Sequence, residues 1–256
     1  MGPARQRSPA GPPDTSPIET ATPAPRTTTD AGATTDPDTI QLLYISDSSG
    51  WKVGEAYREL AERELGVPVE LVDWRFGGFT MTAARDLVRS GRMAVADAEI
   101  VVVWANPLGS GVKEGVDRCV GGPYEDPGVY TVADWEPFAD VAAELLDDVW
   151  EARAGRPTVV RVTDLYTPVL TDWERHGIRE ACLTAFETMS DALREVAESH
   201  GATFVSALDV YNGPDHQRDP VAEGLIDVDG THPSEAGAQA MAEALAAAGF
   251  EPSVGP

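Results

Sequence analysis

From residue 40 onward, the sequence alternates short apolar runs with longer segments in which apolar residues recur at helical spacing. The short runs have the length of β-strands, and the longer segments have the pattern of helices with one buried face. Such alternation favours a parallel sheet with helices on both faces, because each crossover must pack back onto the sheet. We therefore predict one α/β domain over residues 40–256, without internal repeats.

The predicted elements divide the domain into strands, helices and two long polar loops. The predicted strands are Ile40–Ile45, Val67–Val72, Ile100–Val103, Pro157–Val162 and Ala202–Leu208. The predicted helices are Val53–Leu65, Thr82–Arg92, Ala133–Ala152, His176–His200 and Pro233–Ala248. Loops 107–133 and 211–228 separate them, and loops of that length in a compact domain are usually functional. In a parallel sheet, we expect the site beyond the carboxyl ends of the strands.

Residues 1–39 differ in composition from the rest of the chain. They hold 8 of the 20 prolines and almost no large apolar residue, so we predict that this tail is disordered. The chain has a net charge of −24, of which the tail carries only −2. An acidic domain repels phosphate backbones, which argues against nucleic-acid binding.

The sequence leaves the cellular compartment open. No apolar run reaches the length of a membrane helix, and no signal-peptide segment is visible. The Thr/Pro-rich tail resembles a spacer that follows a cleaved signal or a lipid anchor. We expect an extracellular or cell-surface protein if the natural start lies upstream, and otherwise a cytoplasmic one. We also expect a monomer.

Four short stretches contain residue types that acyl transfer requires: a nucleophile, oxyanion donors and an oriented base. Three of them follow predicted strands, and the fourth precedes the last helix. They are Ser46-Asp47-Ser48, Gly78-Phe79-Thr80, Trp104-Ala105-Asn106 and Asp229-Gly230-Thr231-His232.

Each of the first three stretches also has a simple structural interpretation. Ser48 follows a strand and precedes a helix, where it would be a nucleophile or merely cap the helix. Gly78 would present its N–H to an oxyanion or form an ordinary turn. Asn106 would donate its amide to the oxyanion or form an Asx turn before Pro107.

Asp229 and His232 are the most specific pair. Their three-residue offset lets the carboxylate reach one ring nitrogen, which leaves the other nitrogen as a general base. We expect Pro233 to open the last helix, because proline favours the first helical position. The alternative is a solvated turn at the helix entry. The sequence around Asp229 resembles part of a calcium-binding loop, but the other acidic ligands of such a loop are absent. No metal or nucleotide motif is present either, so we predict no metal and no cofactor.

The two cysteines are Cys119, in a Gly-rich loop, and Cys182, on an apolar helical stripe. A disulfide between them and a pair of free thiols are both compatible with the sequence, because pairing depends on the redox compartment.

Together, the four stretches resemble the blocks of the SGNH (GDSL-type) hydrolase family, over residues 40–248. The resemblance implies a flavodoxin-like, three-layer α/β/α fold. Three positions depart from the family pattern: Ser46 and Trp104 replace glycines, and Pro107 replaces an acidic residue. The DGTHP stretch, which holds Asp229 and His232, matches without departure.

The resemblance also implies roles for individual residues. Ser48 would be the nucleophile, with His232 as base and Asp229 orienting it. The oxyanion hole would consist of the Ser48 and Gly78 N–H groups and the Asn106 amide. The side chains of Trp51, Phe79 and Trp104 flank these groups in sequence and are candidates for a substrate wall.

The expected activity is hydrolysis of a carboxylic ester through an acyl-serine, on a small-molecule or glycan ester. One alternative is deacetylation of a carbohydrate, or acetyl transfer to one. Another is a catalytically silent binding domain that keeps the fold, because a fold alone does not establish function.

Overall fold

The computed structural model describes residues 39–104, 106–107 and 110–256. All of them belong to one compact unit, Asp36–Pro256. The tail predicted to be disordered lies outside the described residues, except for its last residue, so that expectation stays a prediction.

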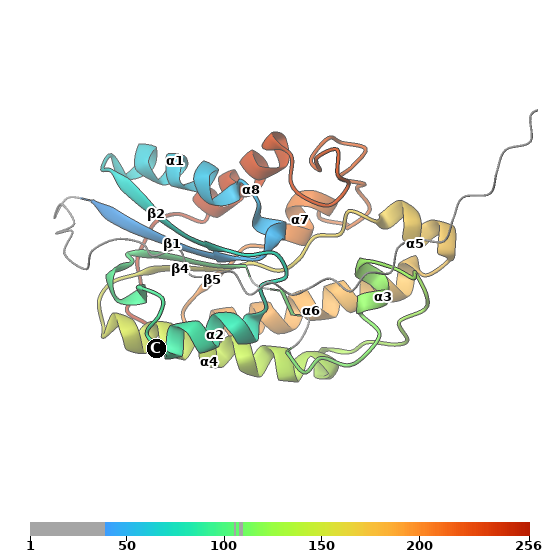
Figure 1. Cartoon of the computed structure of the whole chain (residues 1–256), viewed down its shortest axis with the longest axis horizontal. Helices are drawn as coiled ribbons and strands as arrows, with labels where there is room; N and C mark the ends of the chain where they lie inside the picture. The colour runs from blue at the N-terminus through green and yellow to red at the C-terminus, as the bar shows by residue number, and fades with distance from the viewer. Residues whose placement is uncertain (1–38, 105, 108–109) are drawn as a thin grey trace, which may run out of the picture. The chain divides into compact units, whose positions relative to one another are not determined.

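Five parallel strands form a single sheet in the order β2-β1-β3-β4-β5 (Figure 1). They are β1 (Ile40–Ser46), β2 (Val69–Arg75), β3 (Ile100–Trp104), β4 (Val159–Val162) and β5 (Thr203–Phe204). Every residue of β3 is buried, as expected for a strand covered on both faces. The chain runs from β1 outward to β2 and then returns to the other side of β1 as β3. This reversal of strand order is where parallel sheets bind ligands.

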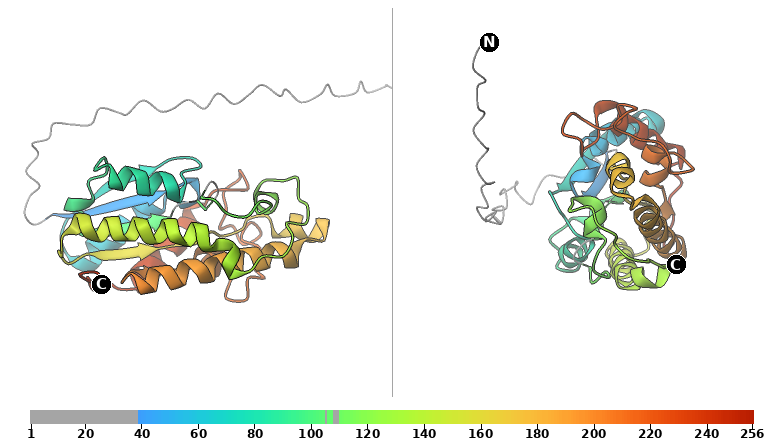
Figure 2. Two further views of the ribbon diagram at one scale, coloured as in Figure 1. Left: turned by 90° about the horizontal axis from the view of Figure 1, so that it is seen from below. Right: turned by 90° about the vertical axis from the view of Figure 1, so that its right-hand side faces the viewer.

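Helices cover both faces of the sheet, which confirms the three-layer α/β/α architecture. Contacts place α1 (Val53–Leu65) with α8 (Glu235–Ala247) on one face. On the other face, α4 (Glu136–Arg153) packs against α2 (Met81–Arg89) and α6 (Arg179–Ser199). Figure 2 shows α4 and α6 running side by side.

The boundary of α1 agrees with the sequence prediction, and local chemistry explains it. Tyr57, Leu60 and Ala61 form its buried face. Gly66 ends the helix with φ 70°, a left-handed conformation that glycine adopts without a steric penalty.

Other boundaries differ because of local stop and start signals. The predicted helix His176–His200 is interrupted at Gly177, whose φ of 69° ends α5 (Leu170–His176) before α6 begins. The predicted strand Ala202–Leu208 is limited to β5, because Ser206 caps α7 (Ala207–Asn212). The predicted loop 107–133 contains the short helix α3 (Asp117–Val120).

The entry to the last helix also differs from the prediction. Ser234 is the N-cap of α8, with its Oγ accepting a hydrogen bond from the Gly237 amide at 3.1 Å. Pro233 therefore precedes the helix and does not open it. His232 likewise lies in the loop before the cap, outside α8.

The disulfide is the one covalent tie between distant elements. Cys119 in α3 is bonded to Cys182 in α6, and neither side chain is exposed. The adjacent Trp173 strengthens this junction, because its indole N–H donates to the Cys119 carbonyl at 2.8 Å. The bond anchors the long loop that follows β3.

Candidate active site

The candidate site lies at the carboxyl ends of β1, β2 and β3. The turn after β1 contains the 3₁₀ segment η1 (Ser48–Gly50). Asp47 is the N-cap of this segment, and its carboxylate accepts from the Ser49 amide at 2.8 Å. Because Asp47 supplies the cap, the Ser48 side chain is not needed for capping and stays partly exposed.

Close packing beneath this turn explains its glycine. A Cβ at Gly50 would lie 2.1 Å from Ser46 Oγ and 2.3 Å from the Tyr44 hydroxyl. Ser46 stands where the family pattern has a glycine, and its Oγ donates to the Asp47 carbonyl at 2.8 Å. The larger residue at position 46 is thus accommodated by the absence of a side chain at position 50.

Backbone hydrogen bonds join the turns after β1, β2 and β3 to one another. The Asp47 amide donates to the Trp104 carbonyl at 3.1 Å, and the Phe76 amide donates to the Ser46 carbonyl at 3.1 Å. The turn after β3 is joined to the turn after β2, because the backbone N–H of Asn106 donates to the Phe79 carbonyl at 3.0 Å. The three turns therefore form one hydrogen-bonded unit.

Gly78 has φ 69°, which is strained for other residues. Within residues 39–104, 106–107 and 110–256, neither the Gly78 amide nor the Ser48 amide donates a hydrogen bond to another protein group. Two such N–H groups, in turns that a backbone hydrogen bond joins, are suitable candidates for oxyanion donors.

The side chain of Asn106 is directed by Asp47. Its Nδ2 donates to Asp47 Oδ2 at 3.0 Å. Burial raises the pKa of the Asp47 carboxyl, and the hydrogen bonds from Ser49 and Asn106 act in the opposite direction. Asp47 therefore links the serine turn to the asparagine through side chains as well as backbone.

Asp229 and His232 form a tight pair. His232 Nδ1 lies 2.7 Å from Asp229 Oδ2, which assigns the proton to Nδ1 and makes Nε2 the acceptor. The His232 amide, the His232 side chain and the Thr231 amide all donate to Asp229 and lower its pKa to about 2. Asp229 is therefore an ionised carboxylate from mildly acid pH upward.

Several contacts hold the histidine loop against the serine turn. The Lys52 ammonium lies 3.2 Å from Asp227 and 3.1 Å from Glu235, which flank the histidine on either side. The buried Tyr166 hydroxyl donates to the Thr231 carbonyl at 2.7 Å. The Trp51 and His232 rings are 6.0 Å apart between centroids.

Of the three aromatic residues proposed as a substrate wall, the structure places one at the surface. Trp51 is 49% exposed, whereas Phe79 and Trp104 are buried in the core. Phe79 and Trp104 therefore contribute to packing, which corrects the sequence expectation. Phe76, which the sequence analysis did not identify, is 40% exposed and contacts Phe79 edge to face.

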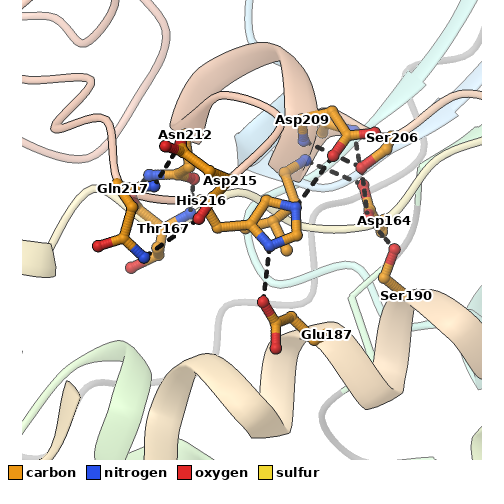
Figure 3. Close-up of polar contacts among 12 residues, drawn as sticks. Asp164, Thr167, Glu187, Ser190, Ser206, Asp209, Asn212, Asp215, His216 and Gln217 are labelled. Atoms are coloured by element: carbon orange, nitrogen blue, oxygen red, sulfur yellow. Dashed lines mark hydrogen bonds and ion pairs between the residues drawn. The ribbon is translucent and has the colours of Figure 1, made fainter. Parts of the chain in front are cut away.

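Another histidine near carboxylates is not equipped to act as a base. Figure 3 shows His216 between Glu187 and Asp209, with its nitrogens 2.9 and 3.0 Å from their oxygens. Both ring nitrogens are occupied. In contrast, Nε2 of His232 has no hydrogen-bond partner in the described part of the chain.

The described residues contain no cluster of three or more His, Cys, Asp or Glu side chains suited to hold a metal ion. Their helices include none that is long and apolar enough to cross a membrane.

Comparison with known proteins identifies the fold. No protein-family model matches the sequence, and no curated protein matches it. Among solved structures, a lipase from a goat rumen metagenome superposes with a TM-score of 0.64 at 16% identity, covering 83% of this chain and 98% of that one. A candidate SGNH hydrolase from Slackia heliotrinireducens gives a TM-score of 0.52 at 16% identity, covering 82% and 98%. The chain has the SGNH-hydrolase fold.

Another structure with this fold is a variant of an acetyl xylan esterase from Geobacillus stearothermophilus. Its TM-score is 0.54 at 16% identity, and the match covers 83% of this chain and 95% of that one. Within the SGNH fold of the present chain, sequence reasoning did not assign roles to Asp47, Lys52 and Tyr166. Their partners are distant in sequence, so only the position of Asp47 inside the first stretch could have drawn attention to it.

Proposed function

We propose that the protein is a cofactor-independent serine ester hydrolase that works through an acyl-serine intermediate. The observation that carries the proposal is the state of His232. One of its ring nitrogens is held by Asp229 at 2.7 Å, and its loop is fastened to the turn that carries Ser48. These contacts support a serine nucleophile with an oriented base.

In the first step, Ser48 Oγ attacks the ester carbonyl while Nε2 of His232 accepts the hydroxyl proton. Negative charge develops on the carbonyl oxygen, where the Ser48 and Gly78 amides and the Asn106 side chain would donate hydrogen bonds. The Asp229 carboxylate stabilises the imidazolium that forms beside it.

The tetrahedral intermediate then collapses. The bond to the alcohol oxygen breaks, and His232 returns its proton to that oxygen, which leaves an acyl group on Ser48. A water molecule then attacks the acyl-serine while His232 accepts a proton from the water. His232 returns this proton to the Ser48 oxygen as the carboxylic acid leaves.

Structures with the same fold support this proposal. One is described as a lipase and another as an acetyl xylan esterase. The exposed indole of Trp51 beside His232 favours carbohydrate O-ester hydrolysis as a second candidate, because an aromatic face can pack against a sugar ring.

Labelling with a fluorophosphonate tests the proposal directly. The wild-type protein should be labelled at Ser48, and Ser48→Ala should lose both labelling and ester hydrolysis while keeping its circular dichroism spectrum. Ser49→Ala is the matched control, because its hydroxyl lies in the same turn, and it should still be labelled. An unlabelled wild-type protein would indicate a silent binding domain instead.

A series of ester substrates would show which acyl group and which alcohol the protein prefers. Acetyl to palmitoyl esters of one alcohol, followed by acetates of several alcohols, separate acyl preference from alcohol preference. A carbohydrate esterase should prefer acetylated sugars over acetates of small linear alcohols.

A further inference from the structure

Asp47 is a buried carboxylate that the proposed mechanism does not use. Only 4% of the residue is exposed, although it stands next to the nucleophile. A buried carboxylate requires hydrogen-bond donors, and here they come from two sides. The Ser49 amide and hydroxyl donate to Oδ1, and Asn106 Nδ2 donates to Oδ2.

The bond to Asn106 decides which end of its amide faces the serine turn. A side-chain amide has a donating NH₂ end and an accepting oxygen end of nearly the same shape. An ionised carboxylate only accepts hydrogen bonds, so Asp47 selects the NH₂ end. The opposite orientation would turn the Asn106 oxygen toward two negative groups, Asp47 and the oxyanion formed during the reaction.

The bond to Ser49 fixes the other donor. As the N-cap of η1, Asp47 sets the conformation of the turn in which the Ser48 amide donates to no other group of the described residues. One carboxylate thus contacts both the turn that supplies the backbone donor and the side chain that supplies the amide donor.

We propose that Asp47 is a positioning residue, which holds the Asn106 amide and the Ser48 turn in the geometry that receives the oxyanion. The inference rests on the proposed ester hydrolysis at Ser48. Asp47 does not touch the substrate; it acts through the two groups that it orients.

A double-mutant cycle with Asn106 tests this role. Asp47→Asn keeps the size of the side chain but offers one accepting oxygen, so it cannot serve both Ser49 and Asn106. We expect kcat for an acetate ester to fall about 10- to 100-fold, less than or equal to the smallest loss of about 100-fold that removal of one oxyanion donor causes, and KM to change less than about threefold. In the Asn106→Ala background, the same substitution should lower kcat less than about threefold.

Two further variants distinguish positioning from a general effect on folding. Asp47→Ser retains an N-cap acceptor for the Ser49 amide but is too short to reach Asn106, and it should lose kcat as Asp47→Asn does. Ser49→Ala removes one donor to Asp47 without affecting the Asn106 contact. Its small effect on kcat should be the same with and without Asn106→Ala.

The outcomes separate the two proposals. If wild-type activity depends on Ser48 but Asp47→Asn and Asn106→Ala act additively, the positioning role is wrong and ester hydrolysis stands. An Asp47→Ser variant with wild-type kcat would also show that the positioning role is wrong. This variant provides the test if Asp47→Asn does not fold. If the wild type lacks Ser48-dependent hydrolysis, the proposed function itself is wrong.

Discussion

The indole ring of Trp51 lies beside the imidazole of His232, with a distance of 6.0 Å between ring centroids and an angle of 46°. The indole also contacts a cation, because the Arg75 guanidinium lies 5.0 Å from a Trp51 ring centroid. Arg75 itself is fixed by ion pairs with Glu55 and Asp73. Trp51 is therefore an exposed but anchored aromatic surface next to the proposed base.

This placement predicts that Trp51 senses the alcohol part of the ester. In the proposed mechanism, His232 gives its proton to the leaving alcohol, so the alcohol would lie on the side of the site where Trp51 stands. Trp51→Ala should lower kcat/KM about 5- to 10-fold for the acetate of a ring alcohol, since an aromatic contact contributes about 0.5–1.5 kcal/mol. For methyl acetate, the change should be less than twofold.

Two comparisons control this prediction. Trp51→Phe should recover part of the lost kcat/KM for the ring alcohol. Hydrolysis of the acetyl-enzyme should be unaffected by Trp51→Ala, because the alcohol that Trp51 would contact has already left. An equal loss for both alcohols would mean that Trp51 supports His232 and does not contact the substrate.

The pH dependence of kcat/KM should show a single rising limb, because only neutral imidazole can accept the proton from Ser48. The pKa of Asp229 is lowered to about 2, so Asp229 remains ionised from mildly acid pH upward and adds no limb of its own.

Asp229→Asn should keep the shape of the pair but favour the wrong imidazole tautomer, which lowers kcat by up to about 10⁴. The measurement is kcat/KM against pH for the wild type and the variant. A fully active variant, or a flat wild-type profile, would contradict the assignment of Asp229 and His232.

His216 should make folding stability depend on pH, independently of catalysis. Burial disfavours its charged form, but hydrogen bonds to Glu187 and Asp209 outweigh burial and raise the pKa of His216. A raised folded-state pKa means that the stabilisation is fully present below the unfolded pKa of about 6.5. It is lost as the pH rises through the folded-state pKa.

Urea unfolding of the wild type and His216→Gln at pH 5.5 and pH 8.5 measures this effect. The difference in unfolding free energy should be larger at the lower pH, and Glu187→Gln should reduce the pH dependence of the wild type. The other groups around His216 are Ser190, Asp191 and Arg194, which line a common cavity of about 250 Å³ with it. If the difference in unfolding free energy between the wild type and His216→Gln were larger at pH 8.5 than at pH 5.5, these neighbouring groups would determine the pH dependence.

Loss of the disulfide should destabilise the protein while leaving the site intact. Cys119 and Cys182 are 63 positions apart, and closing a loop of this length stabilises a protein by about 4 kcal/mol in the chain-entropy model. The double variant Cys119→Ser/Cys182→Ser should unfold at lower urea concentration and still be labelled at Ser48 at low temperature. Unchanged stability would mean that the bond is absent in solution.

The sequence by itself determined the features that depend on local patterns. The periodicity of residues 53–65 and Gly66 together set the bounds of α1. The three-residue offset between Asp229 and His232 made their contact predictable, because the two residues lie in one turn. The alternation of apolar runs and helical segments likewise determined the parallel, three-layer architecture. In contrast, α5 was not predicted, and the predicted helix began at His176, which is the last residue of α5.

Only the tertiary structure decided which distant groups meet. The Asp47–Asn106 bond spans 59 positions and exists because the strand order places β1 between β2 and β3. Trp51 and Trp104 are the same residue type beside the same site, yet one is exposed and the other is core. The sequence encodes both outcomes, but they depend on contacts between segments far apart in the chain. The local preferences that fix helices and strands carry little information about such contacts.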